Sequence, residues 1–284
     1  MPELPEVETV RAGLAPVMEG RAFTTVKLNR KDLRFPFPKS FKKRLEGETL
    51  VSLRRRAKFL MGELSNGETL IMHLGMSGRF TIEAGSWPAE DSPTNPKHDH
   101  VVFHMEAKQA EKSGPYIIYN DPRRFGFMEL LKAGELGRLE HFGPEPLSNQ
   151  FNGPGLYDSL KDKKAPIKTA LLDQNIVAGL GNIYVLEALH ASRIAPTRLS
   201  KDVTKDEADL LTTEIKKTLE LAIKAGGSTL NDFAAADGAL GYFQHRFQVY
   251  GKEGTPCPTQ GCLGEIERIK QSGRSSFYCK VCQN

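Results

Sequence analysis

The 284-residue sequence contains no long apolar run and no cysteine before position 257. A membrane helix needs about 20 consecutive apolar residues, so no segment is predicted to cross a bilayer. The first residues do not resemble a secretory signal either, and we expect a soluble, cytoplasmic protein. All four cysteines lie in the last 28 residues, which argues against a disulfide framework distributed over the chain.

Net charge is also small, +4 from 39 basic and 35 acidic residues, but it is unevenly distributed. Between Arg30 and Lys58, eleven lysines and arginines accompany only three acidic residues, a local excess of +8. Such a cluster indicates either an ordinary solvated surface or a polyanionic partner. The length is sufficient for two domains with a sizeable core.

Pro2 follows the initiator methionine, and removal of that methionine would leave a free secondary amine. An α-amino group titrates near about 8, so part of it is nucleophilic at neutral pH. Such an amine can attack a carbonyl-like carbon and form a Schiff base. Glu3 and Glu6 lie within one helical turn and could act as acid, base or orienting group. The alternative is an ordinary helix start, with Pro5 near the first helical position.

Apolar periodicity predicts an α+β fold. Val7, Val10 and Leu14 recur at helical spacing, which predicts an amphipathic helix over residues 5–18. Short strands with tight turns follow and predict a β-sandwich or a barrel. The predicted strands are Phe23–Leu28, Thr49–Arg55, Phe59–Leu64, Thr69–Leu74, Arg79–Ile82, His100–Met105, Tyr116–Asn120 and Gly126–Leu130.

A stretch rich in glycine and proline between residues 134 and 155 is interpreted as a linker and domain boundary. Helical periodicity dominates beyond it. One helix is predicted to contain Ile167 and Ile176, and another runs from Ile183 to His190. Thr204-x-x-Glu207 is a capping box that opens a long helix, which the glycine pair at 226–227 ends.

Three features of the strand-rich half are candidates for function. Lys58 follows three arginines at a strand start, where a lysine is either solvated or directed into a site. Met76 lies at a glycine-flanked bend, where core packing is the alternative to an exposed wedge. Arg123 and Phe125 share one turn, and an exposed pair of this kind could enter a nucleic-acid stack. The alternative is an arginine–carboxylate pair beside a packed ring.

The cysteines follow the pattern Cys257-x4-Cys262-x16-Cys279-x2-Cys282. Two close pairs of thiols at this separation suit one tetrahedral Zn²⁺. Two disulfides are the alternative, and a reducing compartment disfavours them. Arg268, Lys270 and Arg274 lie between the pairs, so the finger carries a basic hairpin that either contacts nucleic acid or only stabilises the fold.

Taken together, these motifs resemble the bacterial formamidopyrimidine-DNA glycosylases over nearly the whole chain. One departure is the first cysteine pair, which is C-x4-C where the family usually has C-x2-C. The matching segments are Pro2-Glu3-Leu4-Pro5-Glu6-Val7-Glu8-Thr9, Arg54-Arg55-Arg56-Ala57-Lys58, His73-Leu74-Gly75-Met76-Ser77-Gly78, Asp121-Pro122-Arg123-Arg124-Phe125-Gly126, Gly179-Leu180-Gly181-Asn182-Ile183-Tyr184 and the four-cysteine finger.

The resemblance implies three parts. These are a catalytic β-sandwich domain with an N-terminal helix over residues 1–134, a helix–two-turn–helix DNA-binding domain over 135–240, and a zinc finger over 241–284. It implies a base-excision repair enzyme of the bacterial cytoplasm, active as a monomer on double-stranded DNA. Its activities would be glycosylase and strand-cleaving lyase, and its substrates 8-oxoguanine and ring-opened purines. The expected cofactor is one structural Zn²⁺.

Residue roles follow from the same resemblance. Pro2 would be the nucleophile, Glu3 the acid and base, and Glu6 a supporting group. Lys58 and Arg274 would hold phosphates at the catalytic centre. The remaining expected DNA contacts are Met76, His98, Arg123, Phe125, Lys164 and Asn182, and residues 234–242 would close over the extruded lesion.

Two rival interpretations remain. A sister glycosylase for oxidised pyrimidines shares the fold but usually has glycine where Leu4 stands. A non-catalytic DNA-binding protein of the same architecture would need neither Pro2 nor Glu3, and both are present.

Overall fold

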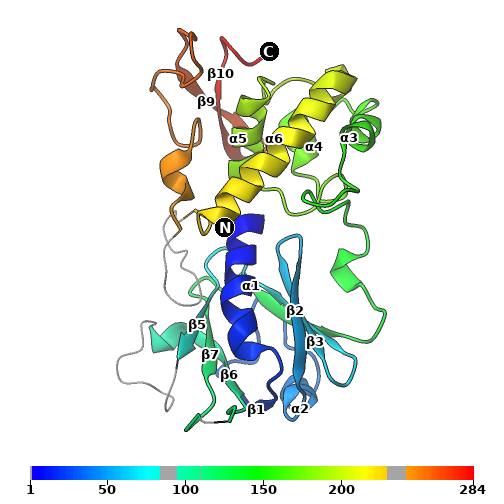
Figure 1. The fold of residues 1–284 in the computed structure, drawn as a ribbon, viewed down its shortest axis with the longest axis vertical. Helices are drawn as coiled ribbons and strands as arrows, with labels where there is room; N and C mark the ends of the chain where they lie inside the picture. The colour runs from blue at the N-terminus through cyan, green and yellow to red at the C-terminus, as the bar shows by residue number, and fades with distance from the viewer. Residues whose placement is uncertain (1, 84–94, 110, 229–240) are drawn as a thin grey trace. The chain divides into compact units, whose positions relative to one another are not determined.

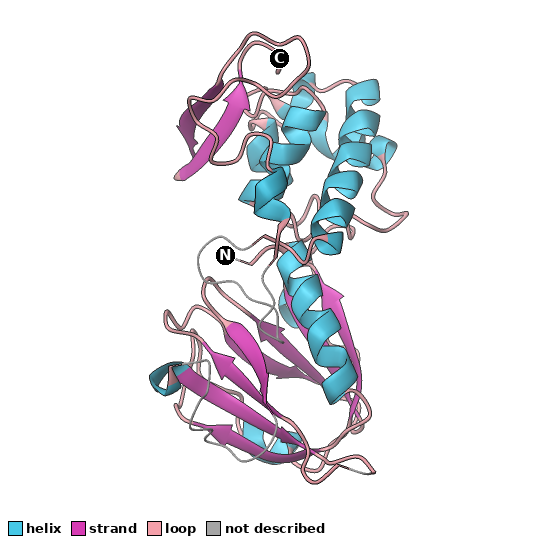
Figure 2. Cartoon of the chain, turned by 60° about the vertical axis from the view of Figure 1, so that its left-hand side comes forward, coloured by secondary structure: helices cyan, strands magenta, loops and turns pink. Residues whose placement is uncertain are grey.

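The computed structural model describes residues 2–83, 95–109, 111–228 and 241–284. The segment expected to close over a lesion lies outside the described residues from 234 to 240. The chain divides into two compact units. The first contains the described part of Met1–Arg138 and of Gly226–Gly241, and the second contains Leu139–Ala225 and Tyr242–Asn284. Figure 2 shows that strands dominate the first unit and helices the second.

The first unit begins with helix α1, Leu4–Met18, and the predicted N-terminal helix is confirmed. Its apolar face, with Val7, Val10 and Leu14, is buried in the core of the first unit. Pro5 occupies the first turn, where its missing N–H costs no hydrogen bond. The helix lies along strand β2, Leu50–Arg56 (Figure 1). Burial of this face fixes the direction in which the residues before Leu4 point.

The described residues that follow in this unit form eight antiparallel strands, and each predicted strand is confirmed to within one residue at either end. They form two four-stranded sheets, in the orders β1-β6-β7-β5 and β2-β3-β4-β8. Their bounds, beside β2, are β1 Phe23–Leu28, β3 Phe59–Leu64, β4 Thr69–His73, β5 Arg79–Glu83, β6 Asp99–Met105, β7 Tyr116–Asn120 and β8 Phe127–Leu131.

The two sheets share one hydrophobic core, so the sandwich is the correct alternative of the two that the pattern left open. Phe23 and Phe103 meet edge to face at 5.4 Å between ring centroids, and Leu60 and Met72 are fully buried on the other sheet. A short helix, α2 at Phe41–Leu45, was not predicted. One turn is too short to display helical periodicity.

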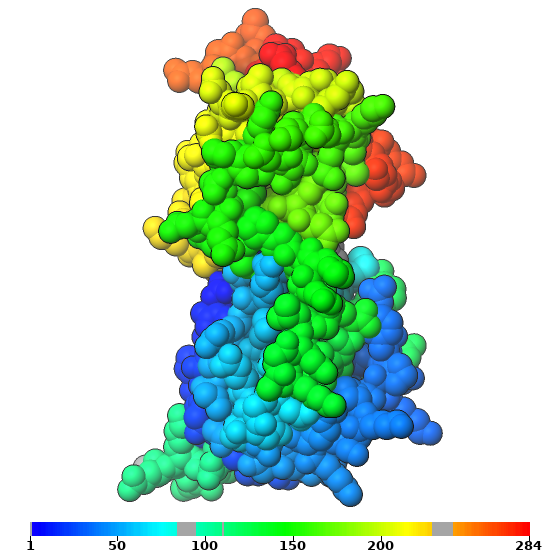
Figure 3. Space-filling model, turned by 90° about the vertical axis from the view of Figure 1, so that its right-hand side faces the viewer, coloured from blue at the N-terminus to red at the C-terminus, as the bar shows by residue number. Residues whose placement is uncertain are grey.

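The second unit contains α3, Gly153–Leu160; α4, Ile167–Leu171; α5, Asn182–Ala191; and α6, Lys205–Lys224. The capping box of α6 is confirmed, because Thr204 and Glu207 each accept a backbone hydrogen bond from the other. The finger adds the hairpin of β9, Ile266–Gln271, and β10, Arg274–Cys279. In Figure 3 this hairpin, coloured orange-red, projects from the surface of its unit. Among the described residues, no helix is long and apolar enough to cross a membrane.

Two predictions about this half were wrong. Residues 153–155 belong to helix α3 and not to the linker, because the Asn152 side chain accepts a hydrogen bond from the Gly155 N–H at 2.9 Å and caps the helix. Helix α4 ends at Leu171 and does not reach Ile176. The Asp173 carboxylate accepts from the Asn175 N–H at 3.0 Å, which replaces the next helical turn with a tight turn.

Candidate active site and metal centre

The start of α1 places the carboxylates of Glu3 and Glu6 in buried positions, with 4% and 2% of each residue exposed. Pro2 is also buried. The Glu6 Oε2 atom accepts from the Glu3 N–H at 2.9 Å. Its Oε1 atom accepts from the N–H and the hydroxyl of Ser228, at 2.8 and 2.9 Å. Glu6 therefore holds the backbone at Glu3 and a segment more than 200 residues later, and sequence reasoning missed Ser228.

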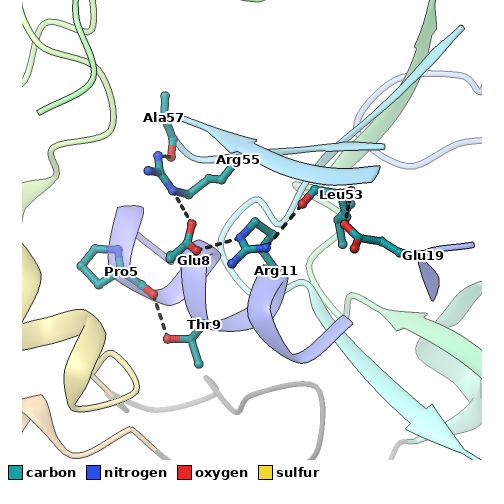
Figure 4. Close-up of polar contacts among 8 residues, drawn as sticks. All are labelled: Pro5, Glu8, Thr9, Arg11, Glu19, Leu53, Arg55 and Ala57. Atoms are coloured by element: carbon teal, nitrogen blue, oxygen red, sulfur yellow. Dashed lines mark hydrogen bonds and ion pairs between the residues drawn. The ribbon is translucent and has the colours of Figure 1, made fainter. Parts of the chain in front are cut away.

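A second carboxylate of α1 connects the helix to the turn that carries Lys58. The Arg55 Nε–H donates to Glu8 Oε2 at 3.0 Å, and Arg55 Nη1 donates to the Ala57 carbonyl at 3.1 Å (Figure 4). Ala57 has a left-handed φ of 52°, a conformation that is unfavourable for alanine. The hydrogen bond from Arg55 therefore helps to stabilise this turn. Lys58 follows directly and is 9% exposed. Lys58 is thus a buried lysine that follows a turn stabilised by the hydrogen bonds of Arg55.

His73, at the end of β4, lies in the electrostatic field of Lys58. Burial, and after it the positive charge of Lys58, lower the pKa of His73 to about 4. The ring is therefore neutral at pH 7. Its Nδ1 atom accepts from the Gly75 N–H at 3.0 Å, which assigns the proton to Nε2. Sequence reasoning used His73 only as part of a motif and gave it no role.

The expected wedge residues converge on one cavity of about 530 Å³. Met76 and Phe125 are 39% and 42% exposed, and the Arg123 guanidinium lies 5.0 Å from the centre of the Phe125 ring. Gly75 has a φ of +62°, and a Cβ there would meet the Gly126 nitrogen at 2.3 Å. The cavity is lined by Leu33, Arg34, His73, Gly75, Met76, Arg123, Arg124 and Phe125.

His98 is half-buried on a short 3-10 helix, Pro96–His98, in the same unit. Its backbone carbonyl accepts from the Asp121 N–H at 3.0 Å. Its ring centroid lies 6.5 Å from that of His100, whose Nε2 contacts the Asp121 carbonyl at 2.9 Å. His98 therefore sits beside the base of the loop that carries Arg123.

In the second unit, Asn182 and Arg274 come close together through the finger hairpin. Asn182 Nδ2 donates to the Ser275 carbonyl at 3.0 Å, and Arg274 is the exposed residue immediately before it. Lys168 Nζ donates to the same carbonyl at 3.1 Å and to Ser276 Oγ at 2.6 Å. Burial lowers the pKa of Lys168 to about 8, and the charge of Arg274 acts in the same direction.

Lys168 is only 1% exposed and was not singled out from the sequence. A lone lysine in a helix gives no signal of burial, because its partners lie more than 100 residues away. Lys164, in contrast, is exposed in the segment before α4.

Glu187 of α5 holds the chain that enters the finger. Its carboxylate accepts three backbone N–H groups, from Gln248 at 2.8 Å, Val249 at 3.1 Å and Tyr250 at 2.8 Å. Burial raises the pKa of Glu187, and these hydrogen bonds act in the opposite direction.

The four cysteines gather at one point, with all Sγ atoms within 4.8 Å of one another. The Sγ atoms of Cys257 and Cys282 are 3.6 Å apart, as are those of Cys262 and Cys279. Tetrahedral Zn²⁺ with Zn–S bonds of about 2.3 Å places sulfurs about 3.8 Å apart. The donor set therefore fits a divalent metal ion such as zinc.

Residues 1–128 match the formamidopyrimidine-DNA glycosylase N-terminal domain, and residues 142–234 match the H2TH domain of the same enzymes. The formamidopyrimidine-DNA glycosylases of Ruegeria pomeroyi and Beijerinckia indica are each 52% identical over the full length of both chains, in alignments of 289 and 293 residues.

Two solved structures show similar folds. The MutM (Fpg) protein of Thermus thermophilus is 37% identical, with a TM-score of 0.84 over 99% of this chain and 98% of that one. The Lactococcus lactis Fpg in complex with DNA containing an abasic site is 33% identical, with a TM-score of 0.86 over the whole of both chains.

The sandwich, the H2TH helices and these relatives define a DNA glycosylase of base excision repair. The predicted enzyme class is thereby confirmed. The chain belongs to the formamidopyrimidine-DNA glycosylase family, whose members carry glycosylase and AP lyase activity.

Proposed function

We propose that this enzyme removes oxidised purines, 8-oxoguanine and formamidopyrimidines, from duplex DNA and then cuts the strand. The observation that carries the proposal is the burial of both Pro2 and Glu3 at the start of α1, where the Glu6 carboxylate holds the Glu3 backbone. A Lactococcus lactis relative that is 34% identical has been crystallised with DNA containing Fapy-dG. Oxidised pyrimidines are the second candidate substrate, because the same relative has also been crystallised with such DNA.

The proposed nucleophile is the amine of Pro2 after removal of the initiator methionine. Attack on the sugar C1′ forms an N–C1′ bond as the base departs, and opening of the sugar ring gives a Schiff base. The Glu3 carboxyl group transfers protons between the departing base and the sugar. The Schiff base acidifies the neighbouring C–H, so that successive eliminations release the phosphates on the 3′ and 5′ sides.

Around this centre we propose two groups of phosphate contacts. Lys58 supplies a cation, and His73 supplies a neutral Nε2–H donor beside it. Arg274 and the Asn182 side chain form the other group, which Lys168 supports. Lys164 and His98 add contacts along the duplex. Phosphate contacts fix the register of the protein on DNA and carry no sequence information.

A damaged base must leave the stack before chemistry can occur. Met76, Arg123 and Phe125 are proposed to fill the space that it leaves, with Arg123 facing the orphaned base. Their exposure and their common cavity support this role. Unstacking costs a few kcal/mol per step, and inserted side chains offset part of it.

Cys257, Cys262, Cys279 and Cys282 are proposed to hold one Zn²⁺ with all four positions filled by protein. Such a site supplies folding energy and no open position for chemistry. Its contribution is to keep β9 and β10 folded and to present Arg274. We further propose that the enzyme acts as a monomer.

Excision assays test the proposed substrate class. Duplexes that contain 8-oxoguanine, a formamidopyrimidine or thymine glycol are incubated with the full chain, and released base and cut strand are measured separately. The proposal expects the two purine lesions to be excised fastest. Faster excision of thymine glycol would overturn it in favour of oxidised pyrimidines.

A further inference from the structure

The first knuckle of the finger is longer than the family pattern by two residues, and the longer loop contains Thr259. The Thr259 hydroxyl lies 3.6 Å from Cys282 Sγ and 3.3 Å from the Nε2 atom of His190. The same Nε2 atom lies 3.7 Å from Cys257 Sγ. One threonine and one histidine therefore contact two of the four sulfurs, one from each cysteine pair.

The His190 imidazole and the Thr259 hydroxyl both lie where burial strengthens a hydrogen bond to sulfur. His190 is in the last turn of α5 and is 6% exposed, and Cys257 is 7% exposed. Thr259 is half-buried. A low local dielectric strengthens such bonds and makes an unpaired polar group costly. Of the two remaining sulfurs, Cys262 Sγ accepts from a different kind of donor, the backbone N–H of Gly264, at 3.4 Å.

The number of hydrogens on each group determines which atom donates in each hydrogen bond. Metal-bound cysteines are thiolates and can only accept. The Thr259 hydroxyl has one hydrogen, and a neutral imidazole has one N–H. Every contact is satisfied when His190 Nε2–H donates toward Thr259 Oγ1 and Cys257 Sγ, while the Thr259 hydroxyl donates to Cys282 Sγ. A proton on Nδ1 would leave Cys257 without its imidazole donor.

We propose that His190 and Thr259 form an outer hydrogen-bonding shell that retains the metal ion of the finger. The inference rests on the zinc site proposed above. Four thiolates give a zinc centre a net charge of −2, and donors that withdraw this charge reduce the tendency of the sulfurs to accept protons or attack electrophiles. Outer-shell partners are commonly worth tenfold to a hundredfold in metal affinity.

The shell also connects the metal centre to the helix that begins at Asn182. His190 is on α5, two turns after Asn182, and Asn182 bonds to Ser275 on the finger hairpin. The finger is thus fastened to α5 at both ends of that helix. Metal retention is expected to depend on α5 and not only on the four cysteines.

The test measures release of zinc from the full-length, zinc-loaded protein to a chelating dye. Thr259→Val removes the hydroxyl at nearly constant volume and is expected to release zinc about tenfold faster. Thr259→Ser keeps the hydroxyl and is expected to remain near the original rate. Thr255→Val is the matched control, because the exposed Thr255 hydroxyl donates to the Lys252 carbonyl at 2.7 Å.

Cobalt substitution gives a second readout that does not depend on the rate of unfolding. Hydrogen bonds stabilise thiolate electrons, so Thr259→Val and His190→Phe are expected to shift the thiolate-to-cobalt charge-transfer band to lower energy. His190→Gln, which can place an amide N–H near Nε2, is expected to restore part of the shift. Unchanged spectra and unchanged release rates in Thr259→Val and His190→Phe would overturn the outer shell.

These outcomes are distinct from failure of the zinc site itself. If the unsubstituted protein contains no zinc and binds no cobalt, the proposed metal centre is wrong. If it holds one ion and the variants behave like it, only the outer shell is wrong.

Discussion

The hydroxyl of Ser77 donates to the Oδ1 atom of Asp121 at 2.6 Å, and both residues are buried. The Oδ2 atom of the same carboxylate accepts from the Gly126 N–H at 2.9 Å and from the Tyr119 hydroxyl at 3.3 Å. Burial raises the pKa of Tyr119, so that its hydroxyl remains a donor. Asp121 therefore binds three donors from three segments of the sandwich.

This carboxylate joins the two loops that carry the proposed wedge. Ser77 directly follows Met76, and its Oγ atom also accepts from the Arg123 N–H at 3.2 Å. Asp121 and Gly126 delimit the turn that contains Arg123 and Phe125. The geometry of the wedge thus depends on a group that would not touch DNA.

Asp121→Asn should lower both stability and excision. The amide has the size of the carboxylate, but one of its two acceptor oxygens is replaced by an NH₂ donor. This donor faces another buried donor, which lowers the free energy of unfolding by about 1–3 kcal/mol. Thermal unfolding and single-turnover excision are measured on the same preparation. Ser77→Ala should reproduce part of the loss in excision rate. A fall in melting temperature with unchanged excision would show that the wedge does not depend on Asp121.

Phe125→Ala should leave the melting temperature nearly unchanged and slow excision. The ring is 42% exposed, so little core packing is lost, whereas the emptied stack in damaged DNA costs a few kcal/mol. Phe80→Ala is the comparison, because Phe80 is fully buried and its truncation should cost about 3–5 kcal/mol. If Phe125→Ala unfolds the protein and spares activity per folded molecule, the ring belongs to the core.

His73 should make stability depend on pH between its unfolded and folded pKa values. Burial lowers the pKa from 6.5 to about 4, so the unfolded chain binds a proton in this window and the folded chain does not. The free energy of unfolding therefore rises as pH increases from about 4 to about 6.5, by on the order of 3 kcal/mol from this group. Above pH 6.5 the contribution is complete.

Denaturant unfolding at several pH values checks this expectation. His73→Gln should flatten the slope between pH 4 and 6.5. His141→Gln, at an exposed histidine, serves as the control and should leave the slope unchanged. Equal slopes in the unsubstituted protein and in His73→Gln would mean that the ring titrates normally.

Lys168→Met should weaken binding to duplex DNA that contains an abasic site. The methionine fills the buried space, but Ser276 Oγ and the Ser275 carbonyl lose the lysine ammonium as a donor, although the carbonyl keeps its bond from Asn182, and the position of Arg274 is released. We expect a loss of about tenfold, comparable with about 1.4 kcal/mol, measured at fixed salt concentration. Lys201→Met, at an exposed lysine, removes the same charge and should have a smaller effect. Equal losses in the two variants would mean that only net charge matters.

The local pattern of apolar residues was sufficient to predict the strands and the long helices. Apolar and polar residues alternate in half-buried strands, and apolar residues recur at a fixed spacing in amphipathic helices. The Asn152 cap shows where local pattern was insufficient, since glycine and proline in the first turn of α3 have the composition of a linker. Motifs singled out Pro2 and Arg123 as candidates, and the cysteine spacing predicted the cluster of four sulfurs.

Residues whose role depends on distant partners could not be found in this way. Ser228 bonds to Glu6 across 222 positions, and Lys168 bonds to Ser276 across 108. A serine or lysine at such a position has no distinctive neighbours in the sequence. The low pKa of His73 likewise arises from burial and from Lys58, which only the folded chain brings together.

The Pro2 amine is proposed to form the covalent intermediate with the opened sugar. Borohydride reduces a Schiff base to a stable bond, so a duplex with 8-oxoguanine should be captured and peptide mapping should place the adduct on Pro2. Intact mass should show that the captured protein lacks the initiator methionine. Pro2→Gly should reduce capture strongly, and Glu3→Gln should reduce base release while preserving binding. Full capture by a chain that retains methionine, or an adduct mapped to Lys58, would contradict the role of Pro2 as the nucleophile.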